Sequence, residues 1–190
     1  FAAGVQDPAR SADGAGVSLL TRKRSASSNA AANVPPPLTI RRLRPGDDAV
    51  LAYLSQENAR FGTLEERQPL TPLPPGESAA FLADDRTATF VAFSGDEPVG
   101  FCYACELYRR HTMLRHLCIY ELGVSERHRN QGIGQALLDA VADHARSQGI
   151  SQGFVITNGR NPAATQLYES VGGVRTADDD VVFAFSWVTD

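Results

Sequence analysis

The chain of 190 residues predicts an α/β fold in which a mixed sheet is flanked by helices. Runs of alternating apolar residues indicate strands, and runs with apolar residues three and four apart indicate amphipathic helices between them. Glycine- and proline-rich stretches separate the two kinds of run. Apolar residues make up 43% of the chain and charged residues 21%, as in a globular domain whose core needs neither metal nor disulfide.

The chain is expected to begin with a flexible tail. Residues 1–37 are rich in Ala, Ser, Gly and Asn, end in three prolines, and follow neither the helical nor the strand period. A single domain is therefore expected over residues 38–190. Its first half is predicted to hold a strand, two helices and three strands, at 38–43, 45–61, 77–85, 87–95, 97–109 and 114–124.

The second half of the domain is predicted to alternate helices and strands. An amphipathic helix is predicted at 133–147, with an apolar stripe formed by Ile133, Leu137, Val141 and Ala145. A strand at 153–158, a helix at 162–171 that is followed by two glycines, and a final strand at 181–187 come after it. The predicted order is therefore β-α-α-β-β-β-α-β-α-β.

Charge is distributed unevenly along the chain, whose formal net charge is −4. The tail holds four basic and two acidic residues, which leaves 14 basic and 20 acidic residues, a net charge of −6, in the domain. An acidic domain argues against nucleic acid as the main partner and suits a cationic substrate, although solubility alone would also explain it. No apolar run approaches the ~18 residues of a membrane span, and the N-terminus lacks an apolar signal core, so a cytoplasmic protein is expected.

No metal site is expected from the cysteines or histidines. Cys102, Cys105 and Cys118 include no second Cys-x-x-Cys pair, and they are interpreted as buried reduced thiols. The four histidines are spaced without a metal-binding pair.

A glycine-rich turn, HRNQGIG at residues 128–134, lies between a predicted strand and a predicted helix. Backbone amides and the positive end of a helix make such a turn a cradle for an anion such as a pyrophosphate, and Arg129 can add a charged contact. The spacing of Gly132 and Gly134 fits neither the Gly-x-Gly-x-x-Gly fingerprint nor the P-loop. A glycine-rich turn without a ligand is the alternative interpretation.

This turn and a second motif together resemble the GNAT family of N-acetyltransferases, which use acetyl-CoA. The family signature Arg/Gln-x-x-Gly-x-Gly/Ala is matched here by Arg129, Gly132 and Gly134. The later family motif is matched by Asn161, Ala164, Leu167, Tyr168 and Gly172. Gly173 and Val174 depart from the usual Gly-Phe. The resemblance covers residues 38–188 and implies the GNAT fold, with a mixed, mostly antiparallel sheet flanked by helices.

Within the family, the aminoglycoside 3-N-acetyltransferases are the branch that this chain resembles most. The run IYELGVSERHRNQGIGQALL at 119–138 is similar to theirs, with Glu121 where that branch has aspartate. Before the later helix the branch tends to have Asp-Asp-Pro, whereas this chain has Arg-Asn-Pro at 160–162. The loss of acids there favours an acceptor other than a polycation.

Two residues are expected to carry the chemistry of acetyl transfer. Glu121 is the only acid inside the strand predicted at 114–124, so it can take a proton from the acceptor ammonium directly or through water. The resemblance places Tyr168 at the general-acid position, from which a hydroxyl protonates the leaving sulfur. A half-exposed strand carboxylate paired with an arginine, and a tyrosine that anchors the core, are the alternative interpretations.

The resemblance also implies where acetyl-CoA binds. Strand backbone is expected to contact the acetyl and pantetheine portions, the turn to bind the pyrophosphate, and an asparagine to contact the pantetheine arm. The expected cofactor residues are Leu122, Gly123, Val124, Arg129, Asn130, Gln131, Gly132, Ile133, Gly134 and Asn161.

The acceptor is a small-molecule amine in the favoured interpretation, which is acetylation of the 3-amino group of an aminoglycoside. Asp178, Asp179 and Asp180 are expected either to form, with Glu121, a rim for a cationic substrate or to be a solvated loop. A GNAT enzyme for a polyamine, another small metabolite or a protein N-terminus, and a non-catalytic module that binds acetyl-CoA, are the alternatives. Members of the family often form homodimers, and the strand at 181–187 is a candidate contributor to such an interface.

Overall fold

The computed structural model describes residues 36–62, 69–110 and 113–175. Apart from Pro36 and Pro37, the expected tail at 1–37 lies outside the described residues. The predicted final strand at 181–187 and the acidic run at 178–180 also lie outside them. The remaining predicted elements can be compared with the structure one by one.

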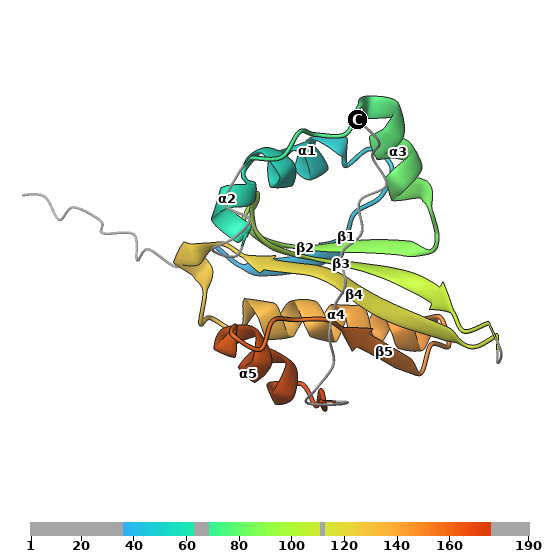
Figure 1. Ribbon diagram of the computed structural model, residues 1–190. Coiled ribbons are helices and arrows are strands. Elements are labelled where there is room, and N and C mark those ends of the chain that lie inside the picture. Colours follow the sequence, from blue (N-terminus) through green and yellow to red (C-terminus); the bar gives the residue numbers. More distant parts are fainter. Residues whose placement is uncertain (1–35, 63–68, 111–112, 176–190) are drawn as a thin grey trace, which may run out of the picture. The chain divides into compact units, whose positions relative to one another are not determined.

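In the part of the chain that the structure describes, a five-stranded sheet lies at the centre (Figure 1). Neighbouring strands follow one another in chain order, the first three pairings are antiparallel, and the last is parallel. The mixed, mostly antiparallel α/β sheet predicted from the sequence is therefore confirmed. The strands are β1 (Leu38–Arg42), β2 (Thr87–Ser94), β3 (Glu97–Tyr108), β4 (Arg115–Val124) and β5 (Gln152–Val155).

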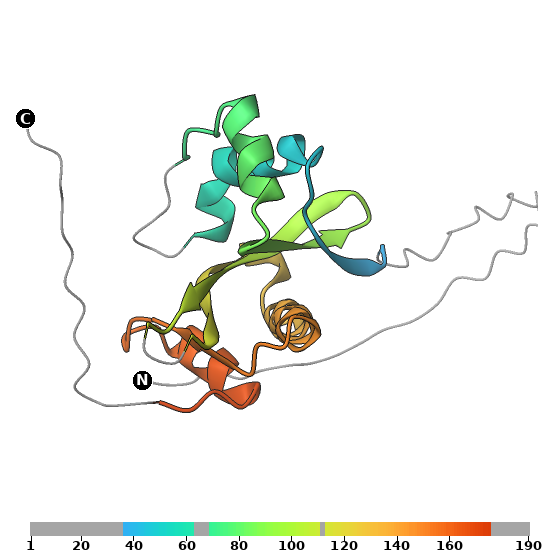
Figure 2. The ribbon, with the colours of Figure 1, turned by 90° about the vertical axis from the view of Figure 1, so that its right-hand side faces the viewer.

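Helices cover both faces of this sheet. Figure 1 shows the helices between β1 and β2 above the sheet and those that follow β4 below it, and Figure 2 shows the helix after β4 end-on beneath the sheet. The upper helices are α1 (Asp48–Gln56), α2 (Asn58–Phe61) and α3 (Pro75–Ala83). The lower helices are α4 (Ile133–Ser147) and α5 (Pro162–Ser170).

The prediction of one helix over residues 45–61 is wrong, because the helix breaks at Glu57. This residue closes α1 with φ −93° and ψ 19°, and the chain resumes as the short α2. Beyond the break, Phe61 is only 3% exposed, and its ring meets that of Phe101 edge-on with centroids 5.9 Å apart. Burial of an aromatic ring against the sheet therefore accompanies the change in direction, which helical periodicity alone does not reveal.

The two faces of the sheet bury separate hydrophobic clusters. The cluster under α1–α3 contains Leu43, Leu54, Phe61, Leu82, Val91 and Phe93. The other cluster includes the buried stripe of α4 formed by Ile133, Leu137 and Val141, as predicted. Because strand side chains alternate between faces, Cys102 and Ala104 join the α4 cluster while Phe101 packs under α1–α3.

A β-bulge interrupts the pairing of β3 with β4. Tyr103 lies opposite Glu121 and the next residue of β3, Ala104, lies opposite Ile119, so Tyr120 is an extra residue in β4. A bulge of this kind bends the strand that carries it and increases its twist. The bend falls where β4 leaves its other neighbour, β5, as described below.

Gly123 is required by the close approach of α2 to β4. A Cβ atom on Gly123 would lie 2.8 Å from Cε1 of Phe101 and 3.0 Å from the backbone oxygen of Phe61. We expect Gly123→Ala to lower the free energy of unfolding by about 1–3 kcal/mol, as overpacking does. Gly76→Ala in α3 is the control, because a Cβ there meets nothing within 4 Å. Urea unfolding measures the free energy of unfolding of both variants. Equal free energies of unfolding for Gly123→Ala and Gly76→Ala would contradict the packing argument.

Candidate active site

One edge of β4 opens after its bulge. β5 pairs with β4 only from His116 to Ile119, whereas β4 continues to Val124. Within residues 36–62, 69–110 and 113–175, no strand pairs with the outer edge of β4 from Tyr120 onward. Backbone groups on this edge can therefore bind a ligand. They include those of the expected cofactor residues Leu122 and Val124, whereas Gly123 lies opposite Phe101 and, like Ser125 opposite Val99, turns its backbone groups toward β3.

The chain that follows β4 forms a cradle at the start of α4. After the 3-10 turn η1 (Glu126–His128), Asn130 and Gly132 both take the left-handed backbone conformation, with φ 59° and 78°. Gly132 is the N-cap of α4 and provides no side-chain cap. The first amides of α4, including those of Ile133 and Gly134, are therefore available to an anion, and the helix dipole favours negative charge there.

Two polar side chains hold the cradle in shape. The Nε of Arg129 donates to the carbonyl oxygen of Val124 at 3.0 Å, and its Nη1 lies 3.9 Å from Oε1 of Glu126. The Nε2 of Gln131 donates to the carbonyl oxygen of Arg127 at 3.1 Å. Arg129 and Gln131 therefore brace the turn against the end of β4, and their contact with a cofactor stays a prediction.

Two other motif residues have structural partners of their own. A Cβ on Gly134 would lie 2.9 Å from Cδ2 of Leu167, so this glycine lets α5 approach α4. Asn161 is the N-cap of α5, and its Oδ1 accepts a hydrogen bond from the amide of Ala164 at 3.1 Å. A contact between Asn161 and pantetheine would therefore come from its side-chain nitrogen.

The expected base and acid lie on opposite faces of the sheet. Glu121 is exposed and stands opposite Tyr103, on the face covered by α1–α3. Tyr168 is half-buried and packs against the α4 cluster. Burial, with a smaller contribution from Cys102, raises the pKa of Tyr168, and Cys102 pairs in register with Leu122. Tyr168 thus lies on the α4 face of the sheet, and its hydroxyl stays protonated at neutral pH.

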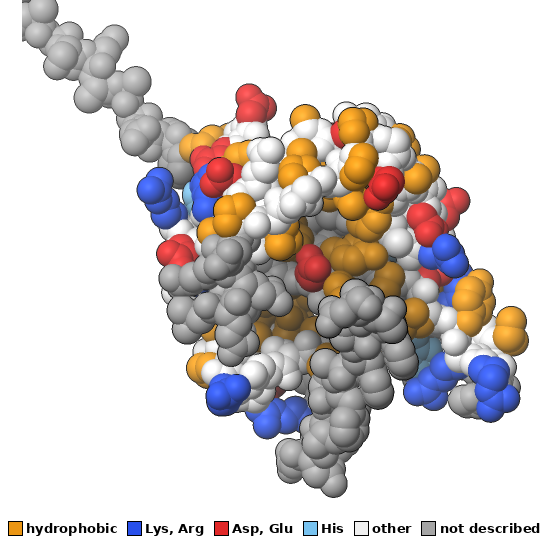
Figure 3. Space-filling model, turned by 45° about the horizontal axis from the view of Figure 1, so that its top comes forward, with side chains coloured by type: hydrophobic (Ala, Val, Ile, Leu, Met, Phe, Trp, Pro, Cys, Tyr) orange, Lys and Arg blue, Asp and Glu red, His pale blue; other side chains and the backbone are white. Residues whose placement is uncertain are grey.

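Three aromatic rings gather on the Glu121 face, and the sequence analysis did not single them out. This aromatic cluster consists of Phe81 of α3, Tyr103 of β3 and Tyr120 of β4. The ring centroids of Phe81 and Tyr103 are 5.3 Å apart, and those of Tyr103 and Tyr120 are 5.8 Å apart. Figure 3 shows a hollow lined largely by hydrophobic side chains, with an acidic side chain at its rim.

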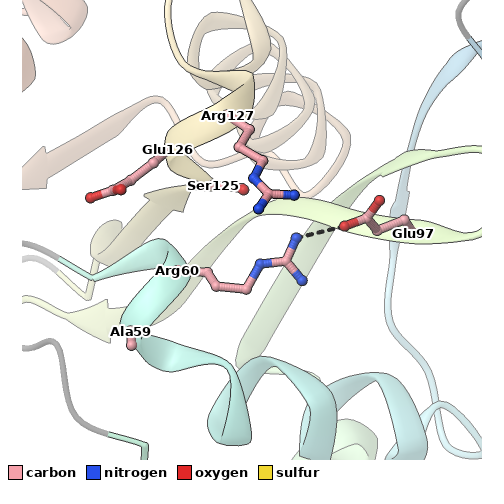
Figure 4. Close-up of a pocket in the computed structure, with 6 residues that line it drawn as sticks. All are labelled: Ala59, Arg60, Glu97, Ser125, Glu126 and Arg127. Carbon is pink, nitrogen blue, oxygen red and sulfur yellow. Dashed lines mark hydrogen bonds and ion pairs between the residues drawn. The ribbon is translucent and has the colours of Figure 1, made fainter.

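A polar pocket lies at the end of β4 that leads into η1. It has a volume of about 510 Å³ and is lined by Ala59, Arg60, Glu97, Ser125, Glu126 and Arg127 (Figure 4). Nη2 of Arg60 lies 2.6 Å from Oε1 of Glu97, and this contact lowers the pKa of Glu97. The ion pair joins α2 to the start of β3, and an exposed pair of this kind contributes about 0–1 kcal/mol to stability.

The described residues contain free thiols and neither a metal-binding cluster nor a membrane-spanning helix. They contain no group of three or more His, Cys, Asp or Glu side chains able to hold a metal ion. Cys102, Cys105 and Cys118 are free thiols; the first and last are buried, and burial raises the pKa of Cys102 to about 12. No described helix has the length and apolarity needed to cross a membrane.

Comparison with known proteins decides the family. Residues 53–173 match the Acetyltransferase (GNAT) family. The chain belongs to the GNAT acetyltransferase family. The family uses acetyl-CoA, and the cradle at the start of α4 fits its pyrophosphate, because Gly132 leaves both the helix amides and the space around its own Cα open.

Curated relatives include acetyltransferases of different kinds. N-acetyltransferase 8 of Rattus norvegicus is 31% identical over 111 residues, which cover 58% of this GNAT chain and 50% of that protein. Mycothiol acetyltransferase of Streptomyces scabiei is 27% identical over 150 residues, which cover 79% of this chain and 47% of that protein. The chain thus spans about half the length of the curated relatives it matches.

Solved structures with the same fold include aminoglycoside acetyltransferases. One from an uncultured soil metagenomic sample, in complex with sisomicin, has a TM-score of 0.67 at 21% identity, over 80% of this chain and 97% of that one. Aminoglycoside N-acetyltransferase AAC(6')-Iy in complex with CoA has a TM-score of 0.61 at 15% identity, over 83% of this chain and 99% of that one. At these identities the likeness concerns the fold.

The charge of the cradle can be tested at Gly132. We expect Gly132→Asp to raise the KM for acetyl-CoA about tenfold or more, because a carboxylate at the start of α4 repels the pyrophosphate. Gly132→Asn is the matched control, since Asn and Asp both cap helices and tolerate a positive φ. Steady-state kinetics and urea unfolding check the pair. Equal KM values for the two variants would contradict anion binding at this turn.

Proposed function

We propose that this chain is an acetyl-CoA-dependent N-acetyltransferase that transfers the acetyl group directly to an amine. One observation carries the proposal: the anion cradle at the start of α4 adjoins the open edge of β4, with Glu121 on one face of the sheet and Tyr168 on the other. This arrangement supplies a place for the phosphates, backbone donors for the thioester, a base and an acid.

Each group has a defined task in the proposed reaction. Glu121 removes a proton from the acceptor ammonium, directly or through water, and so frees the nitrogen lone pair for attack on the thioester carbon. The backbone N–H groups of Leu122 and Val124, on the outer edge of β4, donate to the thioester oxygen as negative charge develops there. The hydroxyl of Tyr168 gives its proton to the sulfur as the carbon–sulfur bond breaks, and the second proton that the attacking nitrogen loses returns the tyrosine to its neutral form. The raised pKa of Tyr168 keeps that proton available at neutral pH.

For the acceptor we propose an aminoglycoside, acetylated at its 3-amino group. The resemblance of residues 119–138 to the 3-N-acetyltransferase branch and the net charge of −6 after residue 37 support this choice. A different amine is the second candidate. The Arg-Asn-Pro sequence at 160–162 favours it, as do curated relatives named N-acetyltransferase 8 and mycothiol acetyltransferase. A cytoplasmic location, a homodimer and the acidic rim at 178–180 stay predictions, and a non-catalytic acetyl-CoA module is the less favoured alternative to the proposed enzyme.

A panel of amines separates these candidates. Thiol release from acetyl-CoA is followed with kanamycin-type and gentamicin-type aminoglycosides, spermidine and N-terminal peptides, and the products are mapped by mass spectrometry. We expect one acetyl group per aminoglycoside, on the 3-amino group. If only another amine of the panel is acetylated, that amine replaces the aminoglycoside as the acceptor. Acetyl-CoA binding without transfer to any amine would leave a binding module.

The assigned base and acid are tested by Glu121→Gln and Tyr168→Phe. We expect each substitution to lower kcat by about 10²-fold or more with little change in the KM for acetyl-CoA, because each removes a proton transfer and preserves side-chain shape. In wild type, the tyrosine is expected to lose its proton only above its usual pKa near 10. Asp139→Asn and Tyr108→Phe, at exposed positions outside the site, are the controls. Full turnover by either test variant would remove that residue from the mechanism.

A further inference from the structure

The aromatic cluster is open to a ligand on the side of Tyr120. Phe81 and Tyr103 are half-buried, whereas 67% of Tyr120 is exposed. The rings of Phe81 and Tyr103 meet at 55°, and those of Tyr103 and Tyr120 meet at 73°. Because neighbouring planes meet at steep angles, the rings form the walls of a corner, and part of that corner faces solvent.

The proposed base belongs to the same corner. Glu121 follows Tyr120 directly and pairs in register with Tyr103, so the bulge places a carboxylate and two tyrosines on adjoining positions of one face. Burial raises the pKa of Tyr103, and Cys105 and Glu121 add to the rise. A carboxylate beside aromatic faces attracts an ammonium, and the faces stack on an apolar ring or attract the cation itself.

We propose that the aromatic cluster is an acceptor subsite for the ring of a ring-bearing amine, which it holds so that the ammonium meets Glu121. The proposal rests on the function proposed above and, among its candidate acceptors, favours ring-bearing amines over a linear polyamine. A rigid ring fills an angled corner with little loss of conformational freedom, whereas a linear polyamine must be immobilised bond by bond. The substrate class is therefore an amine attached to, or close to, a ring with an apolar face.

Binding of two amines with equal charge tests this subsite without requiring turnover. Phenethylamine carries a ring, and octylamine has the same number of carbon atoms in a linear chain. Both are titrated calorimetrically into the full chain in the presence of coenzyme A. We expect phenethylamine to bind more tightly than octylamine. Tyr120→Leu is expected to weaken the binding of phenethylamine about 5- to 10-fold and to change the affinity for octylamine little. The substitution removes an aromatic face and keeps a side chain of similar apolar size.

Two further variants serve as controls. Tyr120→Phe keeps the ring and is expected to retain the affinity for phenethylamine. Tyr108→Leu removes an exposed tyrosine near the end of β3, away from Glu121, and is expected to change neither affinity. Since Tyr120 is largely exposed, its replacement is expected to leave the free energy of unfolding nearly unchanged.

The outcomes separate this inference from the proposed function. No binding of phenethylamine by the wild type, or equal affinities in wild type and Tyr120→Leu, would overturn the subsite even if the amine panel is acetylated. An equal loss of affinity for phenethylamine and octylamine in Tyr120→Leu would also overturn the subsite. The expected binding pattern without acetyl transfer to any amine would support the subsite and overturn the proposed function.

Discussion

The parting of β4 from β5 after Ile119 is the constraint on which the candidate site depends. The extra residue Tyr120 follows Ile119 directly, so the bulge that shifts the register with β3 falls where the parallel pairing with β5 ends. A bulge bends its strand and increases its twist. A β4 that stayed paired with β5 to its end would satisfy its own backbone and leave no edge for a thioester. The bulge thus coincides with the loss of strand pairing at the edge where the thioester is proposed to bind.

The same bend links the two faces of the sheet. Before the bulge, Leu117 and Ile119 point toward α4, and after it Leu122 and Val124 do so. The one-residue shift therefore keeps the apolar set on the core side and brings Tyr120 into ring contact with Tyr103 on the other. An acceptor on the α1–α3 face and a proton donor on the α5 face can meet only where the sheet is open between them.

The sequence predicts what depends on local period and misses what depends on distant contacts. The α4 stripe follows from residue spacing, and the strand boundaries of β2, β3 and β4 fall within one residue of their predicted positions. The break at Glu57 depends on the burial of Phe61 against Phe101, which no local pattern contains. The aromatic cluster joins α3, β3 and β4 through ring contacts between residues far apart in the sequence, which no local pattern predicts. The candidate site is thus predictable along β4 and the turn, but its acceptor side is not.

The glycines show why a motif match does not assign a role to each of its residues. Gly132 has a positive φ and open space, which are the requirements of an anion cradle. Gly134 stands in the same motif but makes room for Leu167, and so serves the contact between α4 and α5. Gly123 precedes the motif and makes room for α2. Packing against backbone would therefore retain Gly123, and the contact with Leu167 favours a glycine at Gly134. At Gly132 the left-handed turn is the structural reason for a glycine, and the proposed anion contact is a second reason.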